Sequence, residues 1–456
     1  MHLMDALQQK NQLELDYGKM EGHRDRSSEA FIAERLIESP TGHIRLMESI
    51  CERENMKRAL RQVRKNKGAP GIDGMTVEEM PGYLKRHWPK IRAMLLSGEY
   101  QPLPVRRKEI EKPDGGIRLL GIPVVMDRLI QQAAAQVLEV IWDRTFSEFS
   151  YGFRPGRSQH MAIQQAKGYM KAGCGFVVDL DLEKFFDRVN HDRLMSRLST
   201  RVPDKRVLKL IGRILRSGVM IGGLCEATDE GTPQGGPLSP LLSNIVLDEL
   251  DKELERRNLH FVRFADDCVI YVRSKRAGDR VKESISRFIT RKLKLKVNEA
   301  KSSVTQPGYT KYLGFGFTIS KTNPKIRIHS KSLGKFRDRV REITVRTRGH
   351  SIQRVITELN EYIRGWWAYF SHCEARSCLR ELNAWVIRRL RAYVWKQWKL
   401  PRTKVRELIK RGIPQYWAIP VGTTRKGAWR LSQNTTVAKA LPESYFLGKL
   451  GLVLPG

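Results

Sequence analysis

Two adjacent aspartates, Asp266 and Asp267, lie between two short apolar runs in the segment FVRFADDCVIYV, residues 261–272. Two apolar runs joined by two turn-forming residues predict a β-hairpin with the aspartate pair at its tip. A turn needs only one residue of this kind and tolerates many others, so the turn alone does not account for two negative charges. The pair is therefore a candidate for a chemical role as well as a structural one.

The charge of the whole chain points to a polyanionic partner. Its 456 residues include 83 Lys and Arg against 49 Asp and Glu, a net charge of +34. Such an excess repels itself unless a polyanion neutralises it, and nucleic acids and membrane surfaces are the two candidates. The chain has no apolar run of about 18 residues, so no transmembrane helix is predicted. Its first residues lack the apolar core of a signal peptide. We therefore expect a nucleic-acid partner and no membrane.

The cysteines favour the cytoplasm. The chain has six, and none form a Cys-x-x-Cys pair. Without such a pair, or a matching pair of histidines, reduced thiols are expected rather than a zinc site. A cytosolic or nucleoid-associated protein fits both this and the positive charge.

A third carboxylate is found upstream, in FVVDLDLEKFFDR, residues 176–188. The apolar start predicts a strand, and Asp179 and Asp181 share one face of it if the strand continues that far. If this strand pairs beside the hairpin, a carboxylate at the end of the strand meets Asp266 and Asp267. Two Mg²⁺ ions in phosphoryl transfer need such shared carboxylate oxygens. The alternative is an ordinary acidic turn beside an unrelated strand end, and the positive charge of the chain favours the catalytic interpretation.

The order of the predicted elements indicates a mixed body followed by a helical region. Helices are predicted at 44–64, 75–98, 124–142, 203–217 and 277–293, and strands at 103–110, 117–122 and 312–319. Strand patterns stop after about residue 325, where two apolar stripes with helical spacing follow at 350–372 and 378–399. The simplest architecture is therefore an α+β body, a basic helical bundle and a short basic tail.

A series of segments carries a resemblance to one family. In order, the chain contains KPDGGIRLLGIP (112–123), YGFRPGRS (151–158), VVDLDLEKFFDRVNH (177–191), GTPQGGPLSPLLSNIVLDELD (231–251), RFADDCVIYV (263–272), LKVNEAKS (295–302) and YLGFGF (312–317). The series resembles the ordered blocks of group II intron-encoded reverse transcriptases and maturases, in particular the short bacterial members associated with group IIC introns. It covers residues 44 to about 430.

The resemblance implies a right-hand polymerase, in which fingers and a palm with an antiparallel sheet precede a helical thumb. By this likeness residues 1–43 are an N-terminal extension, 44–320 are fingers and palm, 321–395 are the thumb or maturase domain, and 396–456 are a basic DNA-binding segment. No Cys and His cluster typical of an appended endonuclease follows residue 400. We therefore expect no endonuclease domain.

The resemblance also assigns roles to single residues. It implies Asp181, Asp266 and Asp267 as the catalytic residues and as the ligands of two Mg²⁺ ions, with Mn²⁺ as a possible substitute. Asp179 matches a variable acidic position. The deoxynucleotide contacts implied are Lys112, Arg118, Gln234 and Phe186, the last as a steric gate against a 2′-hydroxyl; Lys301 is a possible general acid. For the lysines and Arg118 the alternative is a solvated surface charge, for Phe186 a core aromatic residue, and for Gln234 an ordinary turn.

Contacts to the template follow from the same resemblance. Lys65 and Lys67 flank a glycine-rich loop similar to a lid over the template, and Arg154 and Arg157 match residues near the template backbone. The alternative for the loop is a flexible surface segment. YLGFGF resembles the primer grip, although aromatic strands also occur in cores. Most rings of GWWAYF, residues 365–370, are expected to pack in the core.

The function implied is RNA-directed DNA synthesis together with help for intron splicing and mobility. The partners implied are the group II intron RNA, an RNA template with a DNA primer, deoxynucleotides and target DNA. The sequence departs from many relatives at Phe264, where they carry Tyr. Two alternatives remain at this point: an RNA-binding splicing cofactor with dispensable polymerase activity, and a domesticated relative acting in DNA repair or phage defence.

Overall fold

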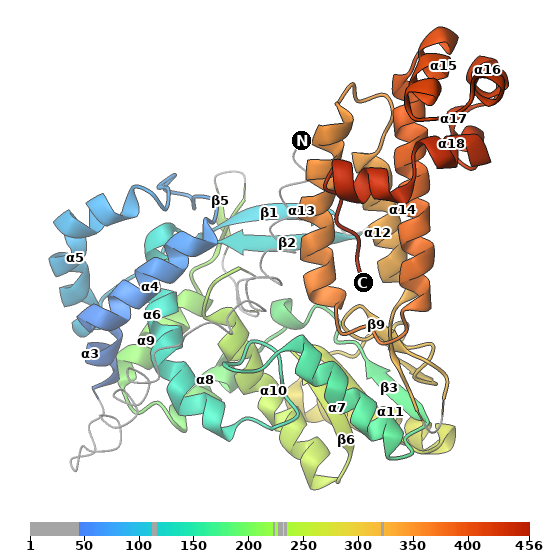
Figure 1. The fold of residues 1–456 in the computed structure, drawn as a ribbon. Coiled ribbons are helices and arrows are strands. Elements are labelled where there is room, and N and C mark those ends of the chain that lie inside the picture. Colours follow the sequence, from blue (N-terminus) through green and yellow to red (C-terminus); the bar gives the residue numbers. More distant parts are fainter. Residues whose placement is uncertain (1–44, 112–115, 222–223, 227–230, 232–234, 321–322) are drawn as a thin grey trace. The chain divides into compact units, whose positions relative to one another are not determined.

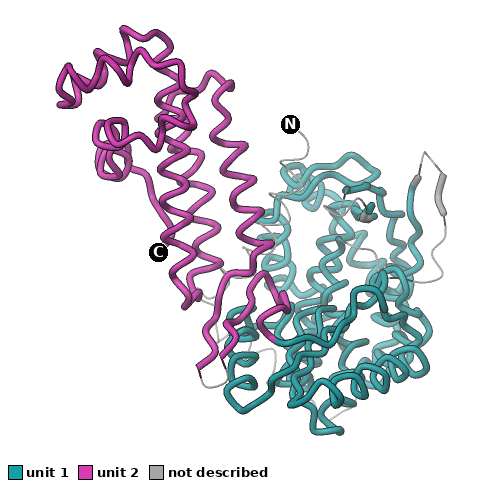
Figure 2. Tube along the Cα trace, turned by 90° about the vertical axis from the view of Figure 1, so that its right-hand side faces the viewer, with its two compact units in different colours: residues 1–306 teal, residues 307–456 magenta. Residues whose placement is uncertain are grey.

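The chain divides into two compact units with separate cores. The computed structural model describes residues 45–111, 116–221, 224–226, 231, 235–320 and 323–456. Contacts group the chain up to Gln306 into unit 1 and Pro307–Gly456 into unit 2 (Figure 2). Both units combine helices with strands, which confirms the predicted α+β class. None of the helices in these described ranges is long and apolar enough to cross a membrane.

The first part of unit 1 is helical. Its helices are α3 (Leu46–Ile50), α4 (Arg53–Asn66), α5 (Met80–Leu96) and α6 (Val125–Trp142). The single helix predicted at 44–64 is in fact two, because Glu52 is extended and its carboxylate accepts a hydrogen bond from the Asn55 amide at 3.0 Å, which caps α4. Helix α6 packs against α4 (Figure 1) and is buried along most of its length, so it forms the centre of this region.

A sheet in the order β2-β1-β4-β5 follows. Strands β1 (Val105–Glu111) and β2 (Ile117–Ile122), both predicted, pair antiparallel. Strands β4 (Val219–Ile221) and β5 (Leu224–Glu226) were not predicted, because three residues are too few to show an alternating pattern. Helices α7 (Gln159–Lys171), α8 (His191–Ser199) and α9 (Lys205–Leu215) complete this half of the unit.

A second sheet, in the order β6-β7-β3-β8, carries the acidic segments. Its strands are β3 (Phe176–Leu180), β6 (His260–Phe264), β7 (Asp267–Val272) and β8 (Ser303–Thr305). Helix α10 (Ser239–Arg256) contacts β6, and helix α11 (Lys275–Phe288) contacts β3, β7 and β8. Helix α7 also contacts β6 and β7. The predicted strand at 176 and the predicted hairpin therefore lie in one sheet, against which α7, α10 and α11 pack.

Unit 2 begins with a two-stranded ribbon. Strand β9 (Phe315–Phe317) pairs antiparallel with β10 (Ile326–Ile328). The prediction that strands stop after about residue 325 is therefore wrong. The pairing with β9, and not a local pattern, makes these three residues a strand. Helices α12 (Ser330–Ile343), α13 (Ile352–Phe370) and α14 (Ser377–Gln397) form the core of the unit, and α15 (Pro401–Lys410), α16 (Gln415–Thr423), α17 (Ala428–Leu431) and α18 (Thr435–Ala440) follow.

Aromatic residues join the ribbon to α13. The ring of Trp366 lies 4.5 Å from that of Phe336 and 4.8 Å from that of Phe370. The Tyr369 hydroxyl donates to the Leu313 carbonyl at 2.9 Å, and the rings of Phe370 and Phe315 are 5.0 Å apart. These rings of the GWWAYF segment therefore pack against protein, as expected.

Candidate active site

The hairpin that carries the aspartate pair has a two-residue turn. Phe264 pairs with Asp267, and Ala265 and Asp266 form the turn between them. Ala265 has a φ of 56°, in the left-handed region that residues with a β carbon seldom adopt. Asp266 is half-buried, whereas Asp267 is exposed and is the first residue of β7. The predicted hairpin is confirmed, with only one aspartate inside the turn.

The upstream strand lies directly beside this hairpin. Strands β3 and β7 are antiparallel, and Leu180 pairs with Cys268. The next position is Asp181, directly after β3, on one side and Asp267, the first residue of β7, on the other, so both lie at the same end of these two strands. Burial raises the pKa of Asp179 to about 6, and the charge of Asp181 adds to this effect. Negative charge is thus concentrated at this edge.

The backbone of Asp181 is held on both sides by one downstream segment. Its amide donates to the Ser302 hydroxyl at 3.0 Å, and its carbonyl accepts from the Asn298 amide at 2.8 Å. A further bridge joins Leu182 to Val297. This segment also contains Lys301, whose side chain is exposed. The structure therefore places the predicted general acid on the segment that borders Asp181.

A buried polar network supports the hairpin turn from inside. The guanidinium of Arg263 donates to both Asp251 carboxylate oxygens, at 2.7 and 2.6 Å, and both side chains are fully buried. The Arg263 Nη1 also donates to the Ala265 carbonyl and to the Asn244 Oδ1, each at 2.9 Å. The Asn244 Nδ2 donates to the Gly152 carbonyl at 2.9 Å. Sequence reasoning missed this network, although an arginine within an apolar strand is a signal of buried pairing.

The segment YGFRPGRS packs against the same turn. A β carbon at Gly152 would lie 2.2 Å from the Ala265 amide nitrogen, so only glycine fits this approach without movement of the backbone. The Tyr151 amide donates to the Arg263 carbonyl at 2.8 Å, and the Arg263 amide donates to the Phe149 carbonyl at 2.9 Å. The turn is therefore enclosed by the backbone of an upstream segment.

The two phenylalanines after Asp181 have different environments. Phe185 is buried, as expected for a core residue, whereas Phe186 is half-buried. Their rings are 5.2 Å apart in an edge-on arrangement. Lys184 adopts a left-handed conformation immediately before them, which turns the chain sharply after the strand.

The two arginines of FRPGR differ in what they contact. The Arg154 guanidinium donates to the Asp143 carboxylate and to the carbonyls of Asp143, Ser147 and Ser150, and its side chain is only 5% exposed. These bonds occupy most of its donors, so Arg154 is better assigned to internal support than to the template phosphates. Arg157 is partly exposed and donates to one carbonyl, that of Glu148 at 2.8 Å.

The glycine-rich loop after α4 is packed rather than loose. The Arg128 Nη2 donates to the Ala69 carbonyl at 2.6 Å, and a β carbon at Gly71 would lie 2.5 Å from the Val124 Cα. Lys65 and Lys67 at its start are exposed. The loop is therefore fixed to α6 while its lysines face solvent.

Three of the predicted nucleotide contacts have no described side chain. Lys112 and Gln234 lie outside the described residues. The backbone of Arg118 lies on β2, opposite Ile110.

The candidate metal ligands are all carboxylates. Across the part of the chain that the structure describes, no three His, Cys, Asp or Glu side chains already converge as a metal site. Asp181, Asp266 and Asp267 come to one sheet edge through the β3–β7 pairing and the two-residue turn. Carboxylate oxygens are the protein ligands that Mg²⁺ prefers, so this set of donors fits a hard divalent cation.

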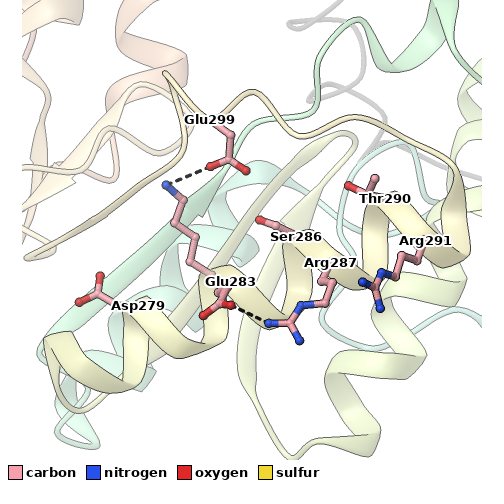
Figure 3. Close-up of a pocket in the computed structure, with 8 residues that line it drawn as sticks. Asp279, Glu283, Ser286, Arg287, Thr290, Arg291 and Glu299 are labelled. Atoms are coloured by element: carbon pink, nitrogen blue, oxygen red, sulfur yellow. Dashed lines mark hydrogen bonds and ion pairs between the residues drawn. The ribbon is translucent and has the colours of Figure 1, made fainter.

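A surface pocket lies elsewhere, along α11. Figure 3 shows its lining, which includes the ion pairs Lys282–Glu299 at 3.5 Å and Arg287–Glu283 at 2.6 Å. None of its lining residues is a predicted site residue. Its charges neutralise each other, so the sheet edge and not this pocket is the candidate active site.

Comparison with known proteins agrees with this geometry. Residues 110–317 match the family described as reverse transcriptase (RNA-dependent DNA polymerase), and residues 333–416 match the group II intron maturase-specific domain. Protein YkfC of Escherichia coli strain K12 is 35% identical, over 57% of this chain and 79% of that protein. The group II intron-encoded protein LtrA of Lactococcus lactis subsp. cremoris is 30% identical, over 56% of this chain and 54% of that protein.

Among solved structures, one similar chain comes from a partial Cas6-RT-Cas1–Cas2 complex. It is 24% identical with a TM-score of 0.35, over 54% of this chain and 42% of that one. The two family matches and the similarity to YkfC and LtrA decide the assignment. The chain belongs to the group II intron-encoded reverse transcriptase and maturase family, whose enzyme class is the RNA-directed DNA polymerases.

Proposed function

We propose that this chain copies intron RNA into DNA at the sheet edge formed by β3 and the β6–β7 turn, with Asp181, Asp266 and Asp267 as its catalytic carboxylates. The observation that carries the proposal is the pairing of β3 with β7, which brings a carboxylate from one segment to the turn of another. The reaction is attack of the primer 3′-hydroxyl on the α-phosphate of a deoxynucleotide, with pyrophosphate as the leaving group.

The three carboxylates would hold two Mg²⁺ ions, with Mn²⁺ as a substitute. Such ions, when bound, lower the pKa of the attacking hydroxyl and neutralise the triphosphate. The protein contributes position: Ser302 and Asn298 fix the backbone of Asp181, and β6–β7 fixes the other two aspartates. Asp266 is proposed as the firmer ligand, and Asp267 as the one with the weaker claim to direct contact.

The nucleotide would be held by residues around this edge. In the proposal Lys112 and Arg118 bind the triphosphate, Gln234 lies near the base, and Phe186 packs on the sugar. The half-buried ring of Phe186 supports its role, because a gate must be fixed on one side and open on the other. Lys301 remains the proposed general acid for pyrophosphate. For the template, the exposed Lys65 and Lys67 and the partly exposed Arg157 are proposed as phosphate contacts.

For splicing, the helical region is the proposed binding site of the intron RNA. We propose residues 44–320 as fingers and palm and 321–395 as thumb and maturase domain. Binding between this basic chain and its RNA should weaken as a power of the salt concentration, because phosphate contacts release counterions. The proposed site of action is the cytoplasm or nucleoid.

Residues 396–456 are proposed to bind target DNA. Helix α15 carries Arg402, Lys404 and Arg406, and Tyr416 and Trp417 on α16 are 70% and 57% exposed. Cations beside exposed rings suit a nucleic-acid surface, since phosphates and bases can both be contacted. Residues 1–43 are left without a role.

One experiment separates polymerisation from splicing. The double variant Asp266→Ala/Asp267→Ala should lose cDNA synthesis while it still promotes splicing of its intron RNA. Retention of cDNA synthesis would show that the site assignment is wrong. If wild-type protein promotes splicing but makes no cDNA, the chain is a splicing cofactor with a dispensable polymerase site.

A further inference from the structure

The hairpin turn that carries Asp266 depends on a residue that does not itself face the site. Strand alternation places Arg263, opposite Cys268, on the sheet face away from Asp267, which pairs with Phe264. Its guanidinium nevertheless reaches the turn, where it donates a hydrogen bond to the Ala265 carbonyl at 2.9 Å. A buried group on one side of the sheet thus contacts the backbone that presents carboxylates on the other.

The buried ion pair of Arg263 and the backbone conformation of Ala265 both carry a cost in free energy, so stability alone does not explain them. A fully buried ion pair such as Arg263–Asp251 loses hydration that apolar side chains would not lose, and it often adds nothing to stability. Ala265 also sits at a φ of 56°, a conformation that persists only where its surroundings impose it. Both costs occur within three residues of the aspartate pair.

We propose that Arg263 is a positioning residue for the reaction, and that Arg263, Asp251 and Asn244 form a clamp that holds the Ala265 carbonyl and so fixes the carboxylates of Asp266 and Asp267. The proposal rests on the proposed function of those two aspartates. Asp251 anchors the guanidinium with two bonds, and Asn244 links it to the Gly152 carbonyl. The clamp therefore connects α10, β6 and the YGFRPGRS segment through bonds to the carbonyls of Ala265 and Gly152.

Two variants weaken the clamp in different ways. Arg263→Lys keeps the charge beside Asp251 but removes the planar fork that reaches Asp251, Asn244 and Ala265 together. Asn244→Ala keeps the Arg263–Asp251 pair and removes the link to Gly152, so it serves if the lysine variant does not fold. The matched control is Arg197→Lys. Arg197, on α8, pairs at 2.6 Å with Asp248, which lies on α10 like Asp251, and its bonds within the described residues go to α10 and not to the turn.

The first measurement is hydrogen–deuterium exchange of peptides that cover residues 261–270 in the full chain. Both clamp variants should exchange faster there, by about tenfold, as expected when a hydrogen bond to a charged group is lost. The control should exchange like wild type in these peptides. Unchanged exchange in both clamp variants would overturn the clamp, whatever the polymerase activity.

The second measurement is single-turnover primer extension at a series of Mg²⁺ concentrations, with primer–template affinity measured separately. The clamp variants should lose about tenfold or more in maximal rate and need more Mg²⁺, with affinity unchanged. Faster exchange with a wild-type rate and Mg²⁺ requirement would overturn the positioning role. If Asp266→Ala/Asp267→Ala retains extension, the proposed function fails instead, and the exchange result still reports on the clamp.

Discussion

The backbone of Gly152 approaches that of Ala265 so closely that a β carbon at position 152 would lie 2.2 Å from the Ala265 amide nitrogen. Gly152→Ala should therefore displace the turn that carries Asp266, and we expect a loss of about 1–3 kcal/mol in the free energy of unfolding, as for other overpacked sites. cDNA synthesis should fall further than stability alone explains. Urea unfolding and primer extension measure the two effects.

The control for this substitution is Gly168→Ala. Gly168 lies within α7, and a β carbon there would meet nothing within 4 Å. Replacement of a helical glycine by alanine should raise stability by about 0.5–1 kcal/mol and leave extension unchanged. Equal behaviour of the two variants would contradict the close approach at Gly152.

A second prediction concerns Ser302, whose hydroxyl oxygen accepts a hydrogen bond from the Asp181 amide at 3.0 Å. Ser302→Ala leaves this partly buried amide without its acceptor, at a cost of about 1–3 kcal/mol. We expect a fall of about tenfold in the extension rate with unchanged primer–template affinity. Ser199→Ala, which removes an exposed hydroxyl at the end of α8, is the control. A wild-type rate for Ser302→Ala would show that this bond does not position Asp181.

A third prediction separates the two phenylalanines. Phe186→Ala should admit ribonucleotides, since the proposed gate on the 2′-hydroxyl is removed, and the ratio of ribonucleotide to deoxynucleotide incorporation measures this. Phe185→Ala should instead cost about 3–5 kcal/mol of stability, because Phe185 is a buried core residue, and should leave sugar selectivity unchanged. Wild-type selectivity in Phe186→Ala would exclude Phe186 as the gate.

A fourth prediction concerns Asp127, which lies in the first turn of α6 and accepts a hydrogen bond from the Tyr100 hydroxyl at 2.7 Å. Burial raises its pKa to about 6, and the bonds from Tyr100 and Leu103 oppose this rise. The folded state therefore holds an extra proton between about pH 4 and pH 6. The contribution of Asp127 to the free energy of unfolding should fall as pH rises through this window, by at most about 3 kcal/mol, and level off above it.

Urea unfolding across pH 4–8 tests this. Asp127→Asn should remove the slope that Asp127 contributes. Tyr100→Phe should raise the upper limit of this window and leave its lower limit unchanged, because the bond from Tyr100 lowers the pKa of Asp127 in the folded state only. An identical pH dependence in wild type and Asp127→Asn would contradict a raised pKa.

The sequence predicts those parts of the site whose pattern is local. The apolar runs around Asp266 and Asp267 determine a hairpin, and the apolar start of FVVDLDL determines a strand, so both were found. β10 was missed because its three residues are ordered by β9 and not by their own pattern. Local sequence patterns therefore do not reveal strands that form only by pairing with a segment distant in sequence.

The arginines illustrate the same limit. Arg154 was expected near the template backbone, yet it bonds the Asp143 carboxylate and three carbonyls. Arg263 was overlooked because its partners Asp251 and Asn244 lie on α10. In both cases the role depends on which acceptors the fold brings near, and the residue type alone does not reveal them.

The most direct test of the account is single-turnover primer extension by Asp181→Asn, because Asp181 is the member of the triad that only the fold brings to the hairpin. Asparagine keeps the shape of the aspartate side chain but removes the negative charge that binds a divalent cation. The account predicts a loss of about a thousandfold or more in rate with wild-type affinity for primer–template. The exposed Asp192→Asn should extend normally. Extension by Asp181→Asn at the wild-type rate would contradict the assignment of the active site.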